Sequence, residues 1–112
     1  MTAPTGDQEA AGTTIVAFVP DLMDRSRISG AVDGVEYARD AVGCADADVV
    51  VIDLARAAAL VGPVRAAVPD ARIVAFGAHV DTGVLEQAAD DGADVVLPRS
   101  KFFQDPAAAL TS

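Results

Sequence analysis

Cysteine, lysine and long apolar runs are all scarce in this sequence of 112 residues. Cys44 is the only cysteine, which excludes an internal disulfide and fits a reducing cytoplasm. No segment reaches the roughly 18 uninterrupted apolar residues of a membrane span. The amino terminus also lacks the basic and apolar regions of a secretory signal. The sequence therefore predicts a cytoplasmic protein with no direct membrane association.

Basic residues are few, because 17 acidic residues face 8 lysines and arginines and leave a formal net charge of -9. This charge repels nucleic acid, so we expect no direct nucleic-acid partner. Lys101 is the only lysine, and Glu9, Glu36 and Glu86 are the only glutamates. The aspartate-rich, lysine-poor composition resembles that of cytoplasmic proteins from extremely halophilic archaea. It predicts a fold that needs salt to screen its surface charge.

Signatures of the common enzyme classes are absent from the sequence. It contains no nucleophile elbow, Walker phosphate loop, dinucleotide glycine fingerprint or metal-ligand spacing. His79 is the only histidine and is a candidate ligand or pH switch, although no cysteine or second histidine lies near it in the sequence. We therefore expect a protein that is not an enzyme and has no cofactor.

Five short apolar runs alternate with segments of helical spacing. Residues 1–12 show no periodicity and are expected to be a disordered leader, followed by a single domain over residues 13–112. The predicted strands cover residues 14–19, 35–38, 47–53, 72–76 and 94–97. The predicted helices cover residues 21–32, 63–68 and 81–92, with one or two helical turns in 39–45 and a short helix after Ser100.

The run from Val49 to Ile52 is β-branched throughout, so both faces of that strand must be covered. With strict alternation of strand and helix, this favours a flavodoxin-like, doubly wound, five-stranded parallel sheet of order 2-1-3-4-5. Ligands of such sheets gather outside the carboxyl ends of the strands. Asp53 follows Ile52 at that edge and is the first candidate site residue.

Two motifs resemble the receiver domains of two-component response regulators, and the resemblance extends over residues 13–105. Gly92-Ala93-Asp94, followed by Val95 to Arg99, is similar to the last corner between helix and strand in a receiver. Val50-Val51-Ile52-Asp53-Leu54 is similar to the strand that presents the phosphoacceptor aspartate. The resemblance implies a receiver fold with Asp53 at the phosphoacceptor position.

The sequence departs from this family at the positions that carry its chemistry. Val19 and Pro20 stand where a receiver has two acids that bind Mg²⁺. Gly77 has no hydroxyl at the position of the usual serine or threonine, and Arg99-Ser100 replaces lysine-proline. The resemblance therefore implies a pseudo-receiver whose phosphorylation site is degenerate.

The remaining members of that degenerate site are Asp53, Arg99, Gly77 and Asp21. Asp53 is a possible phosphoacceptor or a cap bonded to backbone N–H groups. For Arg99 we expect an ion pair with Asp53 across the strand ends, and the alternative is an anion clamp. The ion pair would fix the loops in one state.

The helix after Ser100 looks too short to cover the usual flank of a receiver. We therefore expect a shortened C-terminal helix and an exposed apolar face with Val95, Lys101, Phe102 and Phe103. Such a face predicts binding to a protein partner, which can be a second copy of this chain in a homodimer.

Three functions remain open from the sequence. The preferred hypothesis is a stand-alone, receiver-like signalling and protein-interaction module that does not depend on phosphorylation. The second is a phosphorelay receiver phosphorylated on Asp53, with Mg²⁺ held by Asp21, Asp24 and Asp53. The third is a small-ligand binding or enzymatic domain with a pocket around Asp53, Gly77 and His79.

Overall fold

The structure is a computed structural model that describes residues 13–111, so the leader expected over residues 1–12 lies outside the described part. The strands are β1 (Ile15–Phe18), β2 (Val35–Tyr37), β3 (Val49–Asp53), β4 (Arg72–Gly77) and β5 (Val95–Pro98). They form one parallel sheet of order β2-β1-β3-β4-β5. The predicted fold class and strand order are confirmed.

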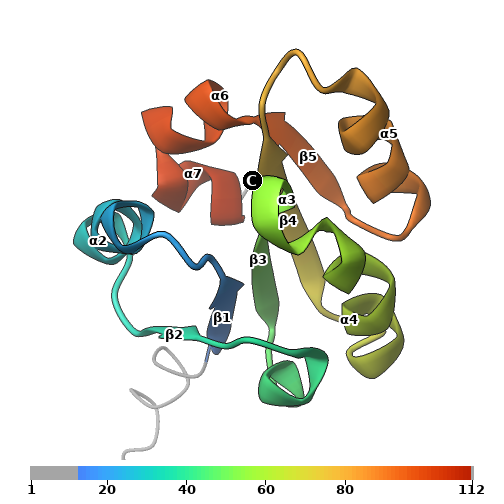
Figure 1. Cartoon of the computed structure of the whole chain (residues 1–112). Helices are drawn as coiled ribbons and strands as arrows, with labels where there is room; N and C mark the ends of the chain where they lie inside the picture. Colours follow the sequence, from blue (N-terminus) through green and yellow to red (C-terminus); the bar gives the residue numbers. More distant parts are fainter. Residues whose placement is uncertain (1–12, 112) are drawn as a thin grey trace, which may run out of the picture.

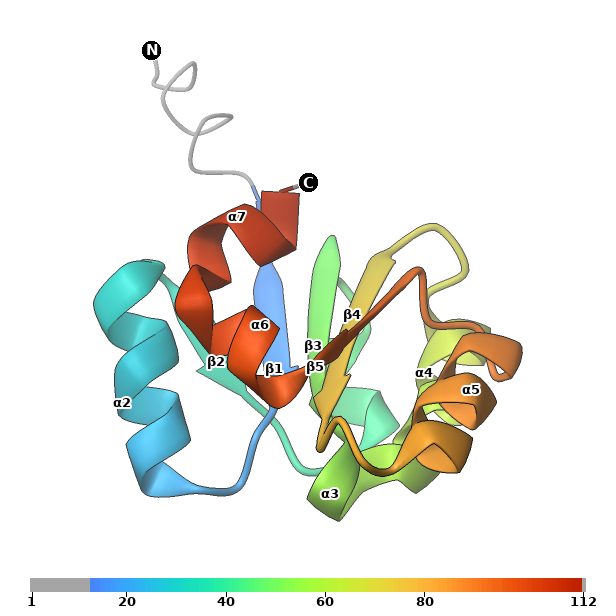
Figure 2. The same ribbon diagram turned by 90° about the horizontal axis from the view of Figure 1, so that it is seen from above.

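The helices lie in two layers, one on each face of the sheet (Figure 1 and Figure 2). One layer holds α2 (Leu22–Ala31), α6 (Arg99–Gln104) and α7 (Pro106–Thr111). The other holds α3 (Leu54–Ala57), α4 (Val61–Ala67) and α5 (Thr82–Asp90), with the 3-10 turns η1 (Ala41–Cys44) and η2 (Ala58–Leu60). Within residues 13–111, no helix is long and apolar enough to cross a membrane.

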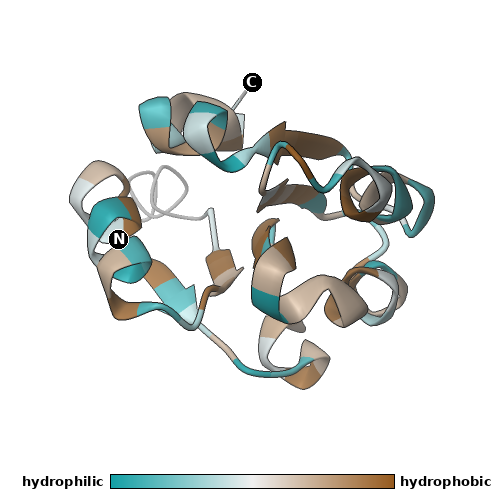
Figure 3. Cartoon of the chain, turned by 45° about the horizontal axis from the view of Figure 1, so that its top comes forward, coloured by the Kyte–Doolittle hydropathy of each residue, from teal (hydrophilic) through white to brown (hydrophobic). Residues whose placement is uncertain are grey.

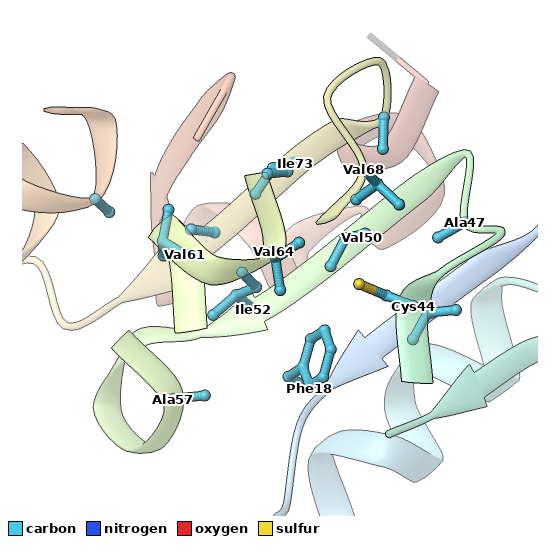
Figure 4. Packing of buried hydrophobic residues seen from close by; sticks show 14 of the residues in the cluster. Phe18, Cys44, Ala47, Val50, Ile52, Ala57, Val61, Val64, Val68 and Ile73 are labelled. Carbon is cyan, nitrogen blue, oxygen red and sulfur yellow. The ribbon is translucent and has the colours of Figure 1, made fainter. Parts of the chain in front are cut away.

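The two faces of β3 bury alternate side chains in two separate hydrophobic clusters, as its β-branched sequence predicts. Val50 and Ile52 pack in the cluster beneath α3 and α4, where Phe18, Cys44 and Val64 also lie (Figure 4). Val51 faces the opposite cluster, beneath α2, α6 and α7. Burial raises the pKa of the Cys44 thiol and disfavours its thiolate. Because both faces of the sheet are covered, hydrophobic residues dominate the strands, while hydrophilic residues occur on α2 and α6 (Figure 3).

The C-terminal segment differs from the prediction. The expected short helix after Ser100 is present as α6, but residues 106–111 form a further helix, α7, which buries Ala109 and Leu110 against the face that α2 also covers. The two short helices together cover this flank of the sheet. Pro106 begins α7, where its missing N–H costs no helical hydrogen bond.

The helix α3 was not predicted, because Asp53 was assigned only to the end of a strand. Pro63 was expected to begin the next helix, yet α4 begins at Val61 and Pro63 is its third residue. A proline at this position also removes no helical hydrogen bond, since the first four N–H groups of a helix have no intrahelical acceptor.

The corner at Gly92-Ala93-Asp94 is fixed by Arg65 of α4. Gly92 has φ of +120°, which an L side chain rarely adopts, and a Cβ there would lie 2.8 Å from Arg65 Cγ. The Arg65 guanidinium donates from Nε and Nη2 to the Gly92 carbonyl at 3.0 and 2.8 Å, and from Nη2 to Asp94 Oδ2 at 2.6 Å. Asp94 Oδ2 also accepts the Ile73 N–H at 2.8 Å.

The same arginine reaches the loop that precedes β4. Its Nη1 donates to the carbonyls of Pro69 and Ala71 at 2.9 and 2.8 Å. Desolvation opposes ionisation of Asp94, but the hydrogen bonds from Ile73 and Arg65 outweigh it and hold the pKa of this carboxyl below its usual value. The motif that carries the receiver resemblance therefore has a structural role at the edge of the sheet opposite Asp53.

Candidate functional site

The carboxyl ends of the strands bring the candidate residues to one edge of the sheet. Asp53 at the end of β3 lies opposite Phe76 of β4, and Gly77 lies opposite Pro98 of β5. Arg99 follows Pro98 as the first residue of α6. Parallel register therefore places Asp53, Gly77 and Arg99 on the same edge, as the sequence predicts.

Asp53 is buried, with 2% of its surface exposed, and it caps α3. Its Oδ1 accepts the Ala55 N–H at 3.0 Å, which satisfies one of the free donors at the start of that helix. Burial raises the pKa of Asp53 above its usual value, and the Ala55 hydrogen bond and the charge of Arg56 only partly offset this. The capping role considered from the sequence is the one that the structure supports.

Arg99 pairs with Asp24 of α2 and not with Asp53. Arg99 Nη1 donates to Asp24 Oδ2 at 2.9 Å, and Nη2 donates to Asp24 Oδ1. Asp24 is 3% exposed, so its charge is compensated in place by a two-point contact. This contact raises the pKa of Arg99 further, and the guanidinium keeps its charge.

The predicted ion pair between Arg99 and Asp53 was therefore wrong. Arginine is long enough to pass the neighbouring strand end and reach the first turn of α2. Asp24 lies 75 positions before Arg99, so no local sequence pattern identified the pair.

Asp21 is the N-cap of α2, at the position where the predicted helix over residues 21–32 begins. Its Oδ1 accepts the N–H groups of Met23 and Asp24 at 2.9 and 3.0 Å, and its Oδ2 lies 3.5 Å from Arg56 Nη1. These hydrogen bonds, the one from Asp24 foremost, lower the pKa of the Asp21 carboxyl. Asp21 is thus engaged in capping a helix.

The acids at this edge do not fit a divalent cation. Both oxygens of Asp24 are held by Arg99, while Asp21 and Asp53 each cap a helix. Within residues 13–111, no group of three or more His, Cys, Asp or Glu side chains is arranged to hold a metal ion. The shifted Mg²⁺ site considered for Asp21, Asp24 and Asp53 is not supported by this geometry.

At Gly77, the space for a switch hydroxyl is already occupied. A Cβ at this position would lie 3.3 Å from Leu54 Cβ and 3.3 Å from Leu85 Cδ2. Gly77 is itself buried, so a serine or threonine side chain would have to displace one of these leucines. Packing has closed the place of the hydroxyl.

His79 is exposed and lines an open cavity of about 790 Å³ with Arg27, Arg99, Lys101 and Phe103. Asp53 and Gly77 are buried and do not line this cavity. The pocket that the third hypothesis requires around Asp53, Gly77 and His79 is therefore not formed by these three residues, since only His79 lines the cavity.

The exposed face expected at Phe102 and Phe103 was wrong for Phe102, and the alternative that one ring is core and its neighbour half exposed is what the structure has. Phe102 is fully buried and stacks on Phe76, with ring centroids 4.6 Å apart. Phe103 packs edge-on against both rings and is half-buried beneath the guanidinium groups of Arg27 and Arg99, at 4.4 and 4.8 Å. These aromatic side chains anchor α6 to the sheet.

No protein-family model matches the sequence, and no curated protein matches it. Solved structures do match. A response regulator from Burkholderia pseudomallei, crystallised with a phosphorylated aspartic acid, a calcium ion and citrate, aligns with a TM-score of 0.73 and 19% identity over 88% of this chain. The alignment spans 66% of that protein, just under two thirds. A receiver domain protein from Clostridium thermocellum has a TM-score of 0.72 and 16% identity, and covers 88% of this chain and 91% of its own.

A third structure is the signal receiver domain of an HD domain-containing protein from Pseudomonas fluorescens Pf-5. It has a TM-score of 0.73 and 16% identity, and covers 88% of this chain and 91% of its own. The chain has the receiver fold. At these identities the receiver fold is what the likeness establishes, and the chemistry has to be argued from the side chains.

Within this receiver fold, we expect Asp53→Asn to stabilise the protein at neutral pH by about 1 kcal/mol, the scale of a typical single substitution. Asparagine keeps an oxygen for the Ala55 N–H and removes a buried carboxylate. Because the native pKa of Asp53 is raised, the stability that it contributes is present below the unfolded pKa and is lost as the pH rises through the native pKa. Urea unfolding from pH 4 to 8 measures this difference.

Asp24→Asn is the matched comparison, since the same chemical change at another buried acid breaks the contact with Arg99. It should lower the stability at neutral pH. If Asp53→Asn is destabilising across the whole pH range, the assignment of Asp53 as a cap with a destabilising charge is wrong.

Proposed function

We propose that this chain is a cytoplasmic signalling and protein-interaction module that is not an enzyme and works without phosphorylation of Asp53. The observation that carries the proposal is the Arg99 guanidinium on both oxygens of Asp24. A phosphoacceptor carboxylate needs a cation that can also contact the incoming phosphoryl group. Here Arg99, which stands at the position of the family's basic residue, is already committed to Asp24.

Two further observations support the same proposal. Leu54 and Leu85 fill the space that a switch hydroxyl at position 77 would need. Asp53 is 2% exposed and its Oδ1 accepts the Ala55 N–H that caps α3, so it is poorly presented to a phosphodonor. We accordingly propose that the protein acts without Mg²⁺ or another cofactor and that its edge loops stay in one state.

For the partner surface, we propose the flank formed by α5, β5 and the exposed side of α6. β5 pairs only with β4 and is an edge strand of the sheet, which makes it available to another chain. Val80, in the turn before α5, is 71% exposed, Val84 in the first turn of α5 is 39% exposed, and Lys101 is exposed on α6. Val95 is half-buried, and Phe102 does not belong to this surface. The partner is a protein, either a second copy of this chain or another signalling protein.

The net charge of -9 supports the proposal that nucleic acid is not a direct partner. The same composition leads us to propose that the fold needs salt, and this stays a prediction. Functional experiments should therefore be repeated at high and low ionic strength.

The test of phosphorylation is incubation with Mg²⁺ and acetyl phosphate, followed by intact-mass measurement. We expect no phosphate adduct on the wild-type protein under conditions that fully modify a receiver known to be phosphorylated, such as the Burkholderia protein. Asp53→Asn is run in parallel because it keeps the α3 cap. An adduct on the wild type that is missing from Asp53→Asn would overturn the proposal and favour the phosphorelay alternative.

A further inference from the structure

A second cleft lies at the carboxyl edge, and Asp53 is not among the residues that line it. β1 has β2 on one side and β3 on the other. The chain after β1 therefore runs to one side of the sheet, and the chain after β3 runs to the other side. Ligands of doubly wound sheets bind at such switch points. A cavity of about 630 Å³ opens here between the ends of β1 and β2 and the segment α3–η2.

The floor of this cleft is apolar and its rim is cationic. Pro20, Ala59 and Leu60 contribute apolar surface, and Arg25, Arg39 and Arg56 are the charged residues that line it. Its lining includes no acidic side chain. The chain as a whole has a net charge of -9, but three guanidinium groups around one cleft give that cleft a positive local potential.

Two of these arginines are held in place while their charge stays available. Arg25 Nε donates to the Val19 carbonyl at 2.6 Å, and its guanidinium lies over the Tyr37 ring at 4.8 Å. Neither contact neutralises its charge. Arg56 has a single ion pair, to Asp21 at 3.5 Å, and its side chain is 53% exposed, so this pairing is weak.

Arg39 is exposed, and within residues 13–111 its side chain makes no hydrogen bond or ion pair. The other basic cavity, beside His79, is less available because Arg99 is committed to Asp24 and both Arg27 and Arg99 cover Phe103. Three guanidinium groups that are not committed to a buried acid therefore gather around this cleft.

We propose that this cleft binds a phosphate monoester with an apolar or aromatic body, of nucleoside-monophosphate size. Guanidinium groups match the geometry of phosphate oxygens in two-point contacts, and the apolar floor suits the body of the ligand. The cavity volume of about 630 Å³ is within the usual range for small-molecule sites. This site uses neither Asp53 nor Arg99, so it stands or falls independently of the signalling role.

The experiment is titration of the ¹⁵N-labelled protein with adenosine monophosphate, adenosine and inorganic phosphate, followed by NMR. We expect saturable shifts at Arg39, Arg56 and Leu60 with adenosine monophosphate. Adenosine and inorganic phosphate, which each lack half of the ligand, should bind at least about tenfold more weakly.

Arg39→Gln should weaken adenosine monophosphate by about tenfold, since it removes one charge-assisted contact. Because Arg39 is exposed and unpaired among the described residues, this variant should keep the wild-type spectrum. Lys101→Gln removes the same charge from the cavity beside His79 and should change the affinity by less than about twofold.

Several results would overturn the proposal. These are no saturable binding of adenosine monophosphate, equal affinity for adenosine, equal loss in Arg39→Gln and Lys101→Gln, or shifts centred on His79 and Lys101. The last result would assign the anion to the other cavity, and equal loss would indicate attraction by overall charge alone.

Discussion

Replacing Arg99 with methionine is expected to lower the free energy of unfolding by about 3 kcal/mol, because it leaves Asp24 buried without its partner. Asp24 is 3% exposed and has both oxygens on Arg99. Methionine keeps apolar contact with the Phe103 ring that Arg99 covers, so packing should change little. Urea unfolding at neutral pH measures the loss.

Arg27→Met is the matched control for this prediction. Arg27 covers the same Phe103 ring at 4.4 Å, but within residues 13–111 it has no ion pair, so its replacement should cost less than about 1 kcal/mol. Adding Asp24→Asn to Arg99→Met should recover part of the loss, since the uncompensated charge is then removed. Equal losses for Arg99→Met and Arg27→Met would show that the contact with Asp24 contributes nothing beyond packing.

The fold was predictable because its determinants are local or periodic. The β-branched run before Asp53 required a central strand, and Gly92-Ala93-Asp94 was recognisable as the corner before the last strand. Each of these depends on residues within a few positions of one another. Strand order then followed from short, right-handed connections.

The site was predictable in place but not in its contacts. Register alone brings Asp53 and Arg99 to one edge, yet the direction of a long side chain depends on tertiary packing. Asp24 was considered only as a metal ligand, and its partner at position 99 lies on another element. Burial of Phe102 was missed for the same reason, since it depends on Phe76 of β4 and on the unpredicted helix α7.

The departures from a phosphorylated receiver form one consistent arrangement. An internal guanidinium takes the place of an exchangeable cation at Asp24, and leucines fill the place of a hydroxyl at Gly77. Each change removes a group that would respond to phosphorylation and adds a fixed contact. These fixed contacts support our proposal that the protein acts as an interaction module without phosphorylation of Asp53.

Arg65→Met is expected to destabilise the opposite edge by about 3 kcal/mol, because it removes one side chain that supplies donors to three carbonyls and one carboxylate. Those acceptors belong to Pro69, Ala71, Gly92 and Asp94, and methionine retains only the aliphatic contact with Gly92. The native pKa of Asp94 is lowered, so its contribution is present above the unfolded pKa of about 4 and is lost as the pH falls through the native value.

The difference in unfolding free energy between wild type and Arg65→Met should therefore shrink as the pH falls below about 4. Arg39→Met is the control, since an exposed arginine without a partner among the described residues should change stability by less than about 0.5 kcal/mol.

Gly92→Ala should also be destabilising, because it forces a Cβ to within 2.8 Å of Arg65 Cγ at a φ of +120°. The cost of Gly92→Ala has two parts, the clash with the side chain at position 65 and the strain of a positive φ. In the Arg65→Met background the strain of the positive φ remains, and the clash remains only if the methionine Cγ lies where the arginine Cγ was. A loss for Arg65→Met no larger than that for Arg39→Met would rule out Arg65 as the residue that fixes the corner between α5 and β5.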